Sequence, residues 1–89
     1  MDARRKKLLF RANHRGFKEM DLIMGHFAEA NLEFMTDVQL DQFEALMDAP
    51  DQDVYAWIVG TGDIPETYQG DVLEQLRAFD VSTILQNPG

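Results

Sequence analysis

The spacing of the apolar residues is the strongest constraint on the fold of this chain. They recur at intervals of three and four, which is the period of a helix with one buried face. The segment 17–28 shows this best, with Phe17, Met20, Met24 and Phe27 in register. No segment alternates apolar and polar residues as a half-buried strand does. The sequence therefore predicts an all-α fold.

The helical stretches follow one another with short connections, and 89 residues suffice for one compact domain. We expect a single domain over 1–89 with about five helices, its tail 86–89 frayed. Two glycines, Gly16 and Gly60, fit as the ends of the first and fourth helices. The first expected helix covers 3–14, and the second starts near Phe17. The third starts at the capping box Thr36–Gln39, and the fourth starts at a capping Asp51. The fifth covers about 66–79.

The inward faces of these helices give a predicted core. Large apolar side chains at helical spacing are far more often core than a ligand-binding surface. The predicted core residues are Met20, Ile23, Met24, Phe27, Leu40, Phe43, Met47, Trp57, Ile58, Leu73, Leu76 and Phe79.

Charge is distributed unevenly along the chain. The net charge is −8, yet seven of the eight basic residues fall within the first 18 positions. Nucleic-acid binding needs a cationic surface, so the net charge argues against it. One interpretation is a basic first helix lying against an acidic body, which would help to hold the fold together. The other is a dipolar molecule that orients itself against a partner.

The sequence offers little for chemistry of its own. It has no cysteine, and its two histidines, His14 and His26, have no second metal-ligand motif near them. A calcium loop starting at Asp51 would have Tyr55 and Gly62 at two ligand positions, so we reject it. No apolar run approaches the ~20 residues of a membrane span. We therefore assign no catalytic, cofactor-binding or metal residue. On the residues alone the enzyme hypothesis is weak, and we expect no membrane insertion.

The third expected helix carries a row of acids, Asp37, Asp41, Glu44 and Asp48, on its outer face. This row suggests an alternative function, a helical adaptor that binds a partner through its acidic face. Two further alternatives are a DNA-binding protein that uses the basic first helix and an enzyme that acts alone. The net charge disfavours the first, and the lack of a catalytic constellation disfavours the second.

The stretch Arg15-Gly16-Phe17-Lys18-Glu19-Met20-Asp21 is an unusual helix junction. Glycine has no side chain, so another backbone can approach closely at this position. A cation and an anion, Arg15 and Glu19, bracket Gly16. An ordinary helix corner with a surface ion pair explains the pattern simply. The functional interpretation is a docking face with a glycine floor between a donor and an acceptor.

These residues carry a resemblance to a known family. The pattern R-G-x-x-E at 15–19, followed by Asp21, resembles the succinate dehydrogenase FAD assembly factors. The segment 43–48 resembles the F-E-x-L-L segment of that family. The segment 51–58 resembles its D-x-D-L-x-x-W-hydrophobic segment, with Gly60 following. Three segments in the right order and spacing cover roughly residues 5–80.

The resemblance implies a five-helix assembly factor and not an independent enzyme. Its partner would be the flavoprotein subunit of succinate dehydrogenase, and in bacteria often that of fumarate reductase. The factor would promote covalent attachment of FAD to a histidine of that partner, with no cofactor bound stably to itself. By the resemblance, the partner-binding residues are Arg15, Gly16 and Glu19, which match directly, and Lys18 and Asp21, which match in character.

The resemblance also implies a compartment. We expect the bacterial cytoplasm, because the chain begins close to the domain, or the mitochondrial matrix if the source is eukaryotic. Three questions stay open at the level of sequence: whether the chain binds FAD directly, whether Glu19 transfers a proton or only docks, and the oligomeric state.

Overall fold

A computed structural model describes residues 1–79 of the chain. Within these residues the secondary structure is entirely helical, which confirms the all-α prediction. The elements are α1 (Ala3–Ala12), α2 (Lys18–Asn31), the 3-10 turn η1 (Leu32–Phe34), α3 (Asp37–Asp48), α4 (Asp51–Val59), the 3-10 turn η2 (Glu66–Tyr68) and α5 (Asp71–Ala78).

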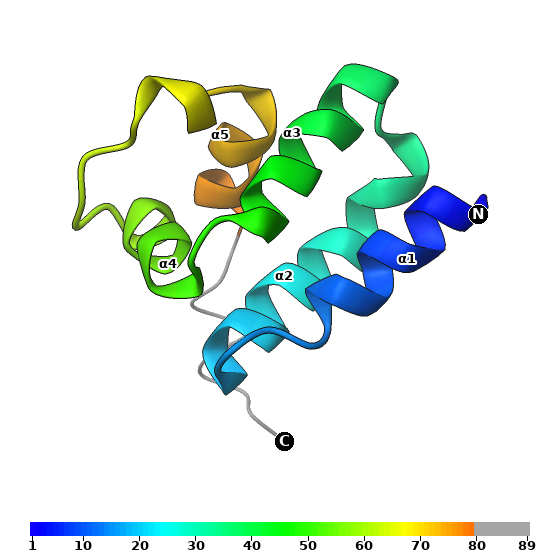
Figure 1. The fold of residues 1–89 in the computed structure, drawn as a ribbon, viewed down its shortest axis with the longest axis horizontal. Helices are drawn as coiled ribbons and strands as arrows, with labels where there is room; N and C mark the ends of the chain where they lie inside the picture. The colour runs from blue at the N-terminus through cyan, green and yellow to red at the C-terminus, as the bar shows by residue number, and fades with distance from the viewer. Residues whose placement is uncertain (80–89) are drawn as a thin grey trace.

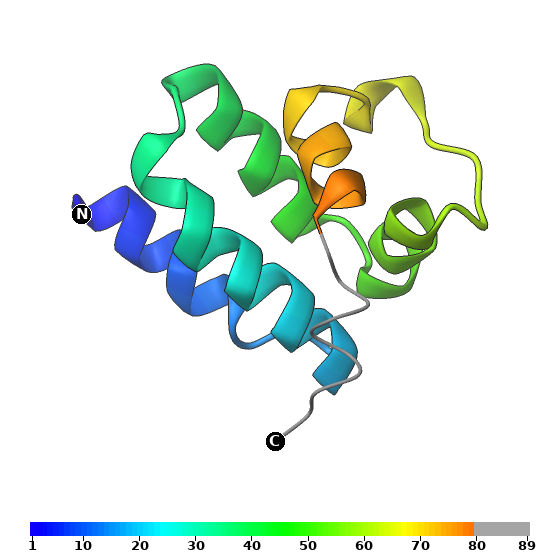
Figure 2. The same cartoon turned by 180° about the vertical axis from the view of Figure 1, so that it is seen from behind.

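The helices form two groups that share α3. Helices α1 and α2 form an antiparallel hairpin, and α3 packs against α1 on one side and α5 on the other (Figures 1 and 2). Helix α4 packs against α5. The corner that joins α1 to α2 lies at the end of the hairpin near α4 (Figure 1). In the described part of the chain, no helix is both long and apolar enough to cross a bilayer.

Local sequence signals set several helix ends. Asp2 caps α1 by accepting the Arg5 backbone N–H at 2.9 Å. This hydrogen bond holds the pKa of the Asp2 carboxyl below its ordinary value. The predicted capping box at the start of α3 is confirmed, since Thr36 and Gln39 each accept the other's backbone N–H. Gly60 ends α4 with φ 83°, also as predicted.

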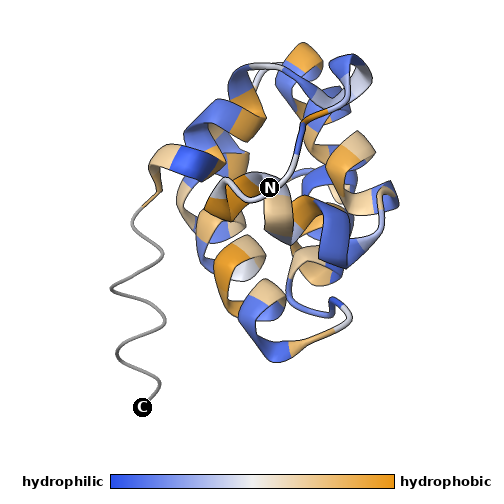
Figure 3. Ribbon diagram, turned by 90° about the vertical axis from the view of Figure 1, so that its left-hand side faces the viewer, coloured by the Kyte–Doolittle hydropathy of each residue, from blue (hydrophilic) through white to orange (hydrophobic). Residues whose placement is uncertain are grey.

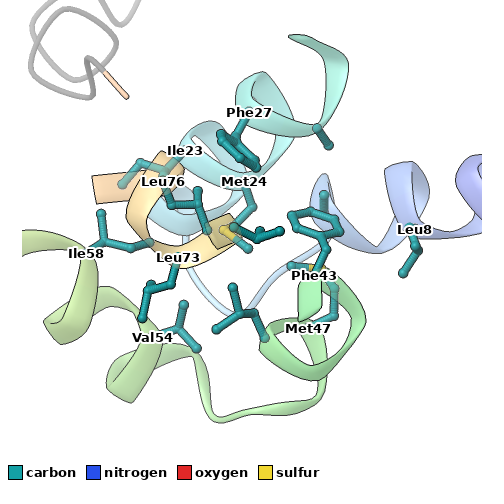
Figure 4. Packing of buried hydrophobic residues seen from close by; sticks show 14 of the residues in the cluster. Leu8, Ile23, Met24, Phe27, Phe43, Met47, Val54, Ile58, Leu73 and Leu76 are labelled. Atoms are coloured by element: carbon teal, nitrogen blue, oxygen red, sulfur yellow. The ribbon is translucent and has the colours of Figure 1, made fainter. Parts of the chain in front are cut away.

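The predicted core is confirmed apart from one residue. Eleven of the twelve residues named from the sequence are buried, and Phe79 is half-buried against them. Met24, Phe43 and Leu73 come from three different helices and meet in the interior (Figure 4). Along each helix, hydrophilic and hydrophobic stretches alternate, as expected where one face is buried (Figure 3). Leu32 and Met35 are buried as well, although no helical period marks them.

The expected helix over 66–79 is wrong in its first part. Residues Glu66–Tyr68 form a separate 3-10 turn, and α5 begins only at Asp71. The reason is a contact from α3, where Gln42 Oε1 accepts the Val72 N–H at 3.1 Å. A Cβ on Gly70 would lie 2.8 Å from that same oxygen. The tail 86–89, which we expect to be frayed, lies outside the described residues.

Candidate functional site: the α1–α2 corner

The stretch singled out in the sequence lies at the corner between α1 and α2. Helix α1 ends at Ala12, and Asn13 caps it by donating from its backbone N–H and from Nδ2 to carbonyl oxygens of the last turn. The expectation that Gly16 ends this helix is therefore wrong. Gly16 lies beyond the cap, in the connection, and it is exposed. Phe17 is extended at the start of α2 and packs edge to face on Tyr55 of α4.

The guanidinium of Arg15 points into the protein. Its Nε donates to Asp51 Oδ1 at 2.8 Å, and Nη2 donates to the same oxygen. Its Nη1 lies 3.6 Å from the sulfur of Met47. Only 9% of the Arg15 side chain is exposed, so this cation is paired within the chain at the edge of the core.

Asp51 binds both residues of the corner. Its Oδ1 accepts from the Arg15 guanidinium, while its Oδ2 accepts the backbone N–H of Gly16. The expectation that Asp51 caps the fourth helix is wrong, because Pro50 occupies that position and Asp51 is the first helical residue. A carboxylate in the first turn is still favourable near the positive end of the helix dipole. The side chain reaches backward to a segment more than thirty residues earlier.

Glycine at position 16 leaves room for this close approach. A Cβ added to Gly16 would lie 2.6 Å from Asp51 Oδ2, closer than real Cβ contacts come. Among the described residues, only Gly60 has a φ in the left-handed region, so left-handed backbone is not the reason for Gly16. Any larger residue at position 16 must therefore displace the carboxylate that also holds Arg15.

The other three predicted site residues lie in the first turns of α2. Lys18 and Glu19 are exposed, and within residues 1–79 neither takes part in an ion pair. Asp21 is half-buried, and its Oδ1 accepts the Arg15 backbone N–H. The corner thus has an inner set, Arg15 and Asp21, with internal partners, and an outer set, Gly16, Lys18 and Glu19, open to solvent.

The acidic row on α3 lies against the basic helix α1. Arg4 Nη2 contacts Asp41 at 2.6 Å and Glu44 at 3.1 Å. Arg11 contacts Asp48 at 2.6 Å. The interpretation of a basic first helix lying against an acidic body is confirmed. Three acids of the row therefore have cationic partners already, which weakens the row as a docking surface for an adaptor.

Residues 1–79 hold neither a metal-binding cluster nor a pocket. Within this range, no three side chains among His, Cys, Asp and Glu come together as a metal-holding group. The surface of the same residues has no detectable pocket.

The sequence as a whole matches a family model. Residues 6–80 match the model described as "Flavinator of succinate dehydrogenase". This range contains the complete corner, the acid Asp51 and all helices after the first turn of α1.

Three relatives show the same likeness. The chain is 39% identical, over 82% of its length, to "Succinate dehydrogenase assembly factor 2, mitochondrial" of Dictyostelium discoideum. It is 37% identical, over 89% of its length, to the protein of that name in Danio rerio. It is 39% identical, over 83% of its length, to "FAD assembly factor SdhE" of Acetobacter pasteurianus. The match spans 52% and 51% of the two mitochondrial relatives and 68% of the bacterial one.

Proposed function

This chain belongs to the family of succinate dehydrogenase flavinators, and we propose that it is an assembly factor for covalent FAD attachment. It binds the flavoprotein subunit of succinate dehydrogenase and promotes attachment of FAD to that subunit. The single observation that carries the proposal is the match over residues 6–80. The names of its relatives in Acetobacter pasteurianus and Danio rerio support the same function. The flavoprotein subunit of fumarate reductase is a second candidate partner.

The role of the chain in this function is positional. A covalent bond between FAD and a side chain of the partner forms fast only when the two reacting groups are held in line. An assembly factor supplies this by binding one conformation of the partner more tightly than the others. It needs no nucleophile and no stably bound cofactor of its own, and we assign no catalytic residue.

The surface proposed to contact the partner is the docking face, which we define as Gly16, Lys18 and Glu19. Its residues are exposed and close in sequence, and they offer a cation, an anion and a backbone without a side chain. Arg15 and Asp21, the other two proposed partner-binding residues, support this face from beneath. A carboxylate surrounded by water is a poor general base, so Glu19 is assigned to docking.

The place of action follows from the partner. We propose the cytoplasm for a bacterial source and the mitochondrial matrix for a eukaryotic one, and two relatives carry the word mitochondrial in their names. The chain would act wherever the flavoprotein subunit receives its FAD.

The variant Gly16→Arg tests the proposal. It fills the docking face and displaces Asp51, so covalent flavin on a co-produced flavoprotein subunit should fall by at least about tenfold, which corresponds to about 1.4 kcal/mol. Covalent flavin is read as fluorescence of the denatured subunit in a gel, and circular dichroism confirms that the variant is folded.

The matched control is Gly62→Arg. It introduces the same side chain at another exposed glycine, where a Cβ lies at an ordinary 3.4 Å from Ala56. Covalent flavin should stay at the level of the unmodified chain. A normal yield with folded Gly16→Arg would refute the docking face, and an equal loss with both variants would show that the added charge alone is responsible.

A further inference from the structure

Asp51 lies outside the stretch that the resemblance marks as the binding motif, yet its carboxylate accepts three hydrogen bonds from that stretch. One carboxylate oxygen binds the Arg15 guanidinium and the other binds the Gly16 backbone N–H. Its side chain is 18% exposed, against 64% for Asp48, which pairs with Arg11 of α1. The Asp51 pair is therefore shielded from water far better than the neighbouring one.

Two carboxylates together fix the backbone of the corner. Asp21 of α2 accepts the N–H of Arg15, and Asp51 of α4 accepts the N–H of Gly16. Two successive backbone donors are thus held by acids from two different helices. A backbone held at both peptide groups presents one surface to a partner, and this saves the ordering cost that a mobile corner would incur on binding.

Contacts within the chain engage three of the five N–H donors of the Arg15 guanidinium, and only 9% of the side chain is exposed. Nε and Nη2 are directed at Asp51, and Nη1 lies against the Met47 sulfur. Binding a partner through the guanidinium would require breaking a well-shielded ion pair first, which leaves the Asp51 charge without its counterion. The contacts favour a supporting role for Arg15.

We propose that Asp51 is a positioning residue for partner binding, and that Arg15 contributes to binding through Asp51 and not by touching the partner. This inference rests on the proposed function, since it concerns the same docking face. Asp51 orients Gly16 directly, through the backbone N–H, and joins the corner to α4. The edge-to-face pair of Phe17 and Tyr55 is the second connection between the corner and α4.

The test measures the affinity of the full chain for the flavoprotein subunit before its FAD is covalently attached. Asp51→Asn keeps the size of the side chain but removes its charge and turns one acceptor into a donor, so Kd should rise by at least about tenfold. Asp48→Asn makes the same change in charge at the exposed pair with Arg11, and its Kd should stay within about twofold. An unchanged Kd for folded Asp51→Asn would overturn the inference.

A double-variant cycle separates positioning from direct contact. If Arg15 acts through Asp51, then Arg15→Gln with Asp51→Asn should bind no more weakly than the worse of the two single variants. If Arg15 touches the partner itself, the two losses in affinity multiply, and that result would contradict the inference. Thr36→Ala, which weakens α3 far from the corner in sequence, shows whether lower stability alone reduces binding, and it should bind normally.

Two further variants keep the outcome unambiguous. If Asp51→Asn does not fold, Asp51→Glu retains the charge but moves the carboxylate by one methylene, and it should still bind several-fold more weakly. Glu19→Gln tests the docking face independently. Loss of binding with Glu19→Gln but not with the Asp51 variants would reject only the positioning role, whereas normal binding with Gly16→Arg and Glu19→Gln would reject the docking face itself.

Discussion

At the scale of single residues, the corner depends on the distance between Gly16 and the Asp51 carboxylate. The glycine is there because a carboxylate occupies the space of a Cβ, and the carboxylate is there because it binds Arg15 and a backbone N–H. The three residues therefore act as a unit, and changing one displaces the others. Residues that act as a unit are expected to have non-additive effects when they are changed together.

This interdependence predicts the effect of the smallest substitution on stability. Gly16→Ala should lower the free energy of unfolding by about 1–2 kcal/mol, because the new Cβ pushes Asp51 away from its donors. Urea unfolding followed by circular dichroism measures the change. Gly62→Ala, where a Cβ has room, should leave stability unchanged or raise it by up to about 1 kcal/mol. Equal effects of the two alanines would contradict the proposed contact.

Only part of the corner could be predicted from the sequence, because some of its contacts join residues that are far apart along the chain. The stretch 15–21 could be singled out because its glycine and charges are neighbours in the sequence. The role of Asp51 could not, because its donors lie more than thirty positions away and its place at a helix start suggested a cap. The available signal was an acid that follows a proline at a helix start, Asp51, together with an arginine and a glycine, Arg15 and Gly16, to which the sequence assigned no partner within the chain.

At the scale of elements, the helices whose ends are encoded locally were predicted well. The capping box at Thr36 and the left-handed Gly60 depend only on contacts within a few residues along the chain, so the sequence alone specifies them. The start of α5 was missed because the Gln42 side chain, thirty residues before Val72, decides it. Leu32 and Met35 were missed because one lies in a short 3-10 turn and the other in the extended residue after it, where no α-helical period reveals the buried side.

The capping box gives a prediction at this scale. Thr36→Ala removes the acceptor for the Gln39 N–H at the start of α3, so the free energy of unfolding should fall by about 1 kcal/mol. Chemical denaturation measures the change, with Thr36→Ser as the control because serine retains the hydroxyl acceptor. A loss as large for serine as for alanine would show that the cap is not the source. Partner affinity should be unaffected by either variant.

At the scale of the whole molecule, the uneven distribution of charge along the sequence leads to ion pairs between the basic helix α1 and the acidic helix α3. Arg4 and Arg11 pair with acids of α3, and Arg15 pairs with the first residue of α4. The four arginines among the first 18 residues thereby all pair with acids within the fold. The exposed cation and anion at the α1–α2 corner, Lys18 and Glu19, are left for a partner.

The central claim is that the flavoprotein subunit docks at this corner, and mapping the bound surface tests it most directly. Backbone NMR spectra of the isotope-labelled chain would be compared with and without the unlabelled flavoprotein subunit. The account predicts that the largest signal changes and losses cluster at residues 15–21 and at Asp51, with small changes along the outer face of α3. Changes centred on Asp37 and its neighbours in α3, with 15–21 unaffected, would contradict it.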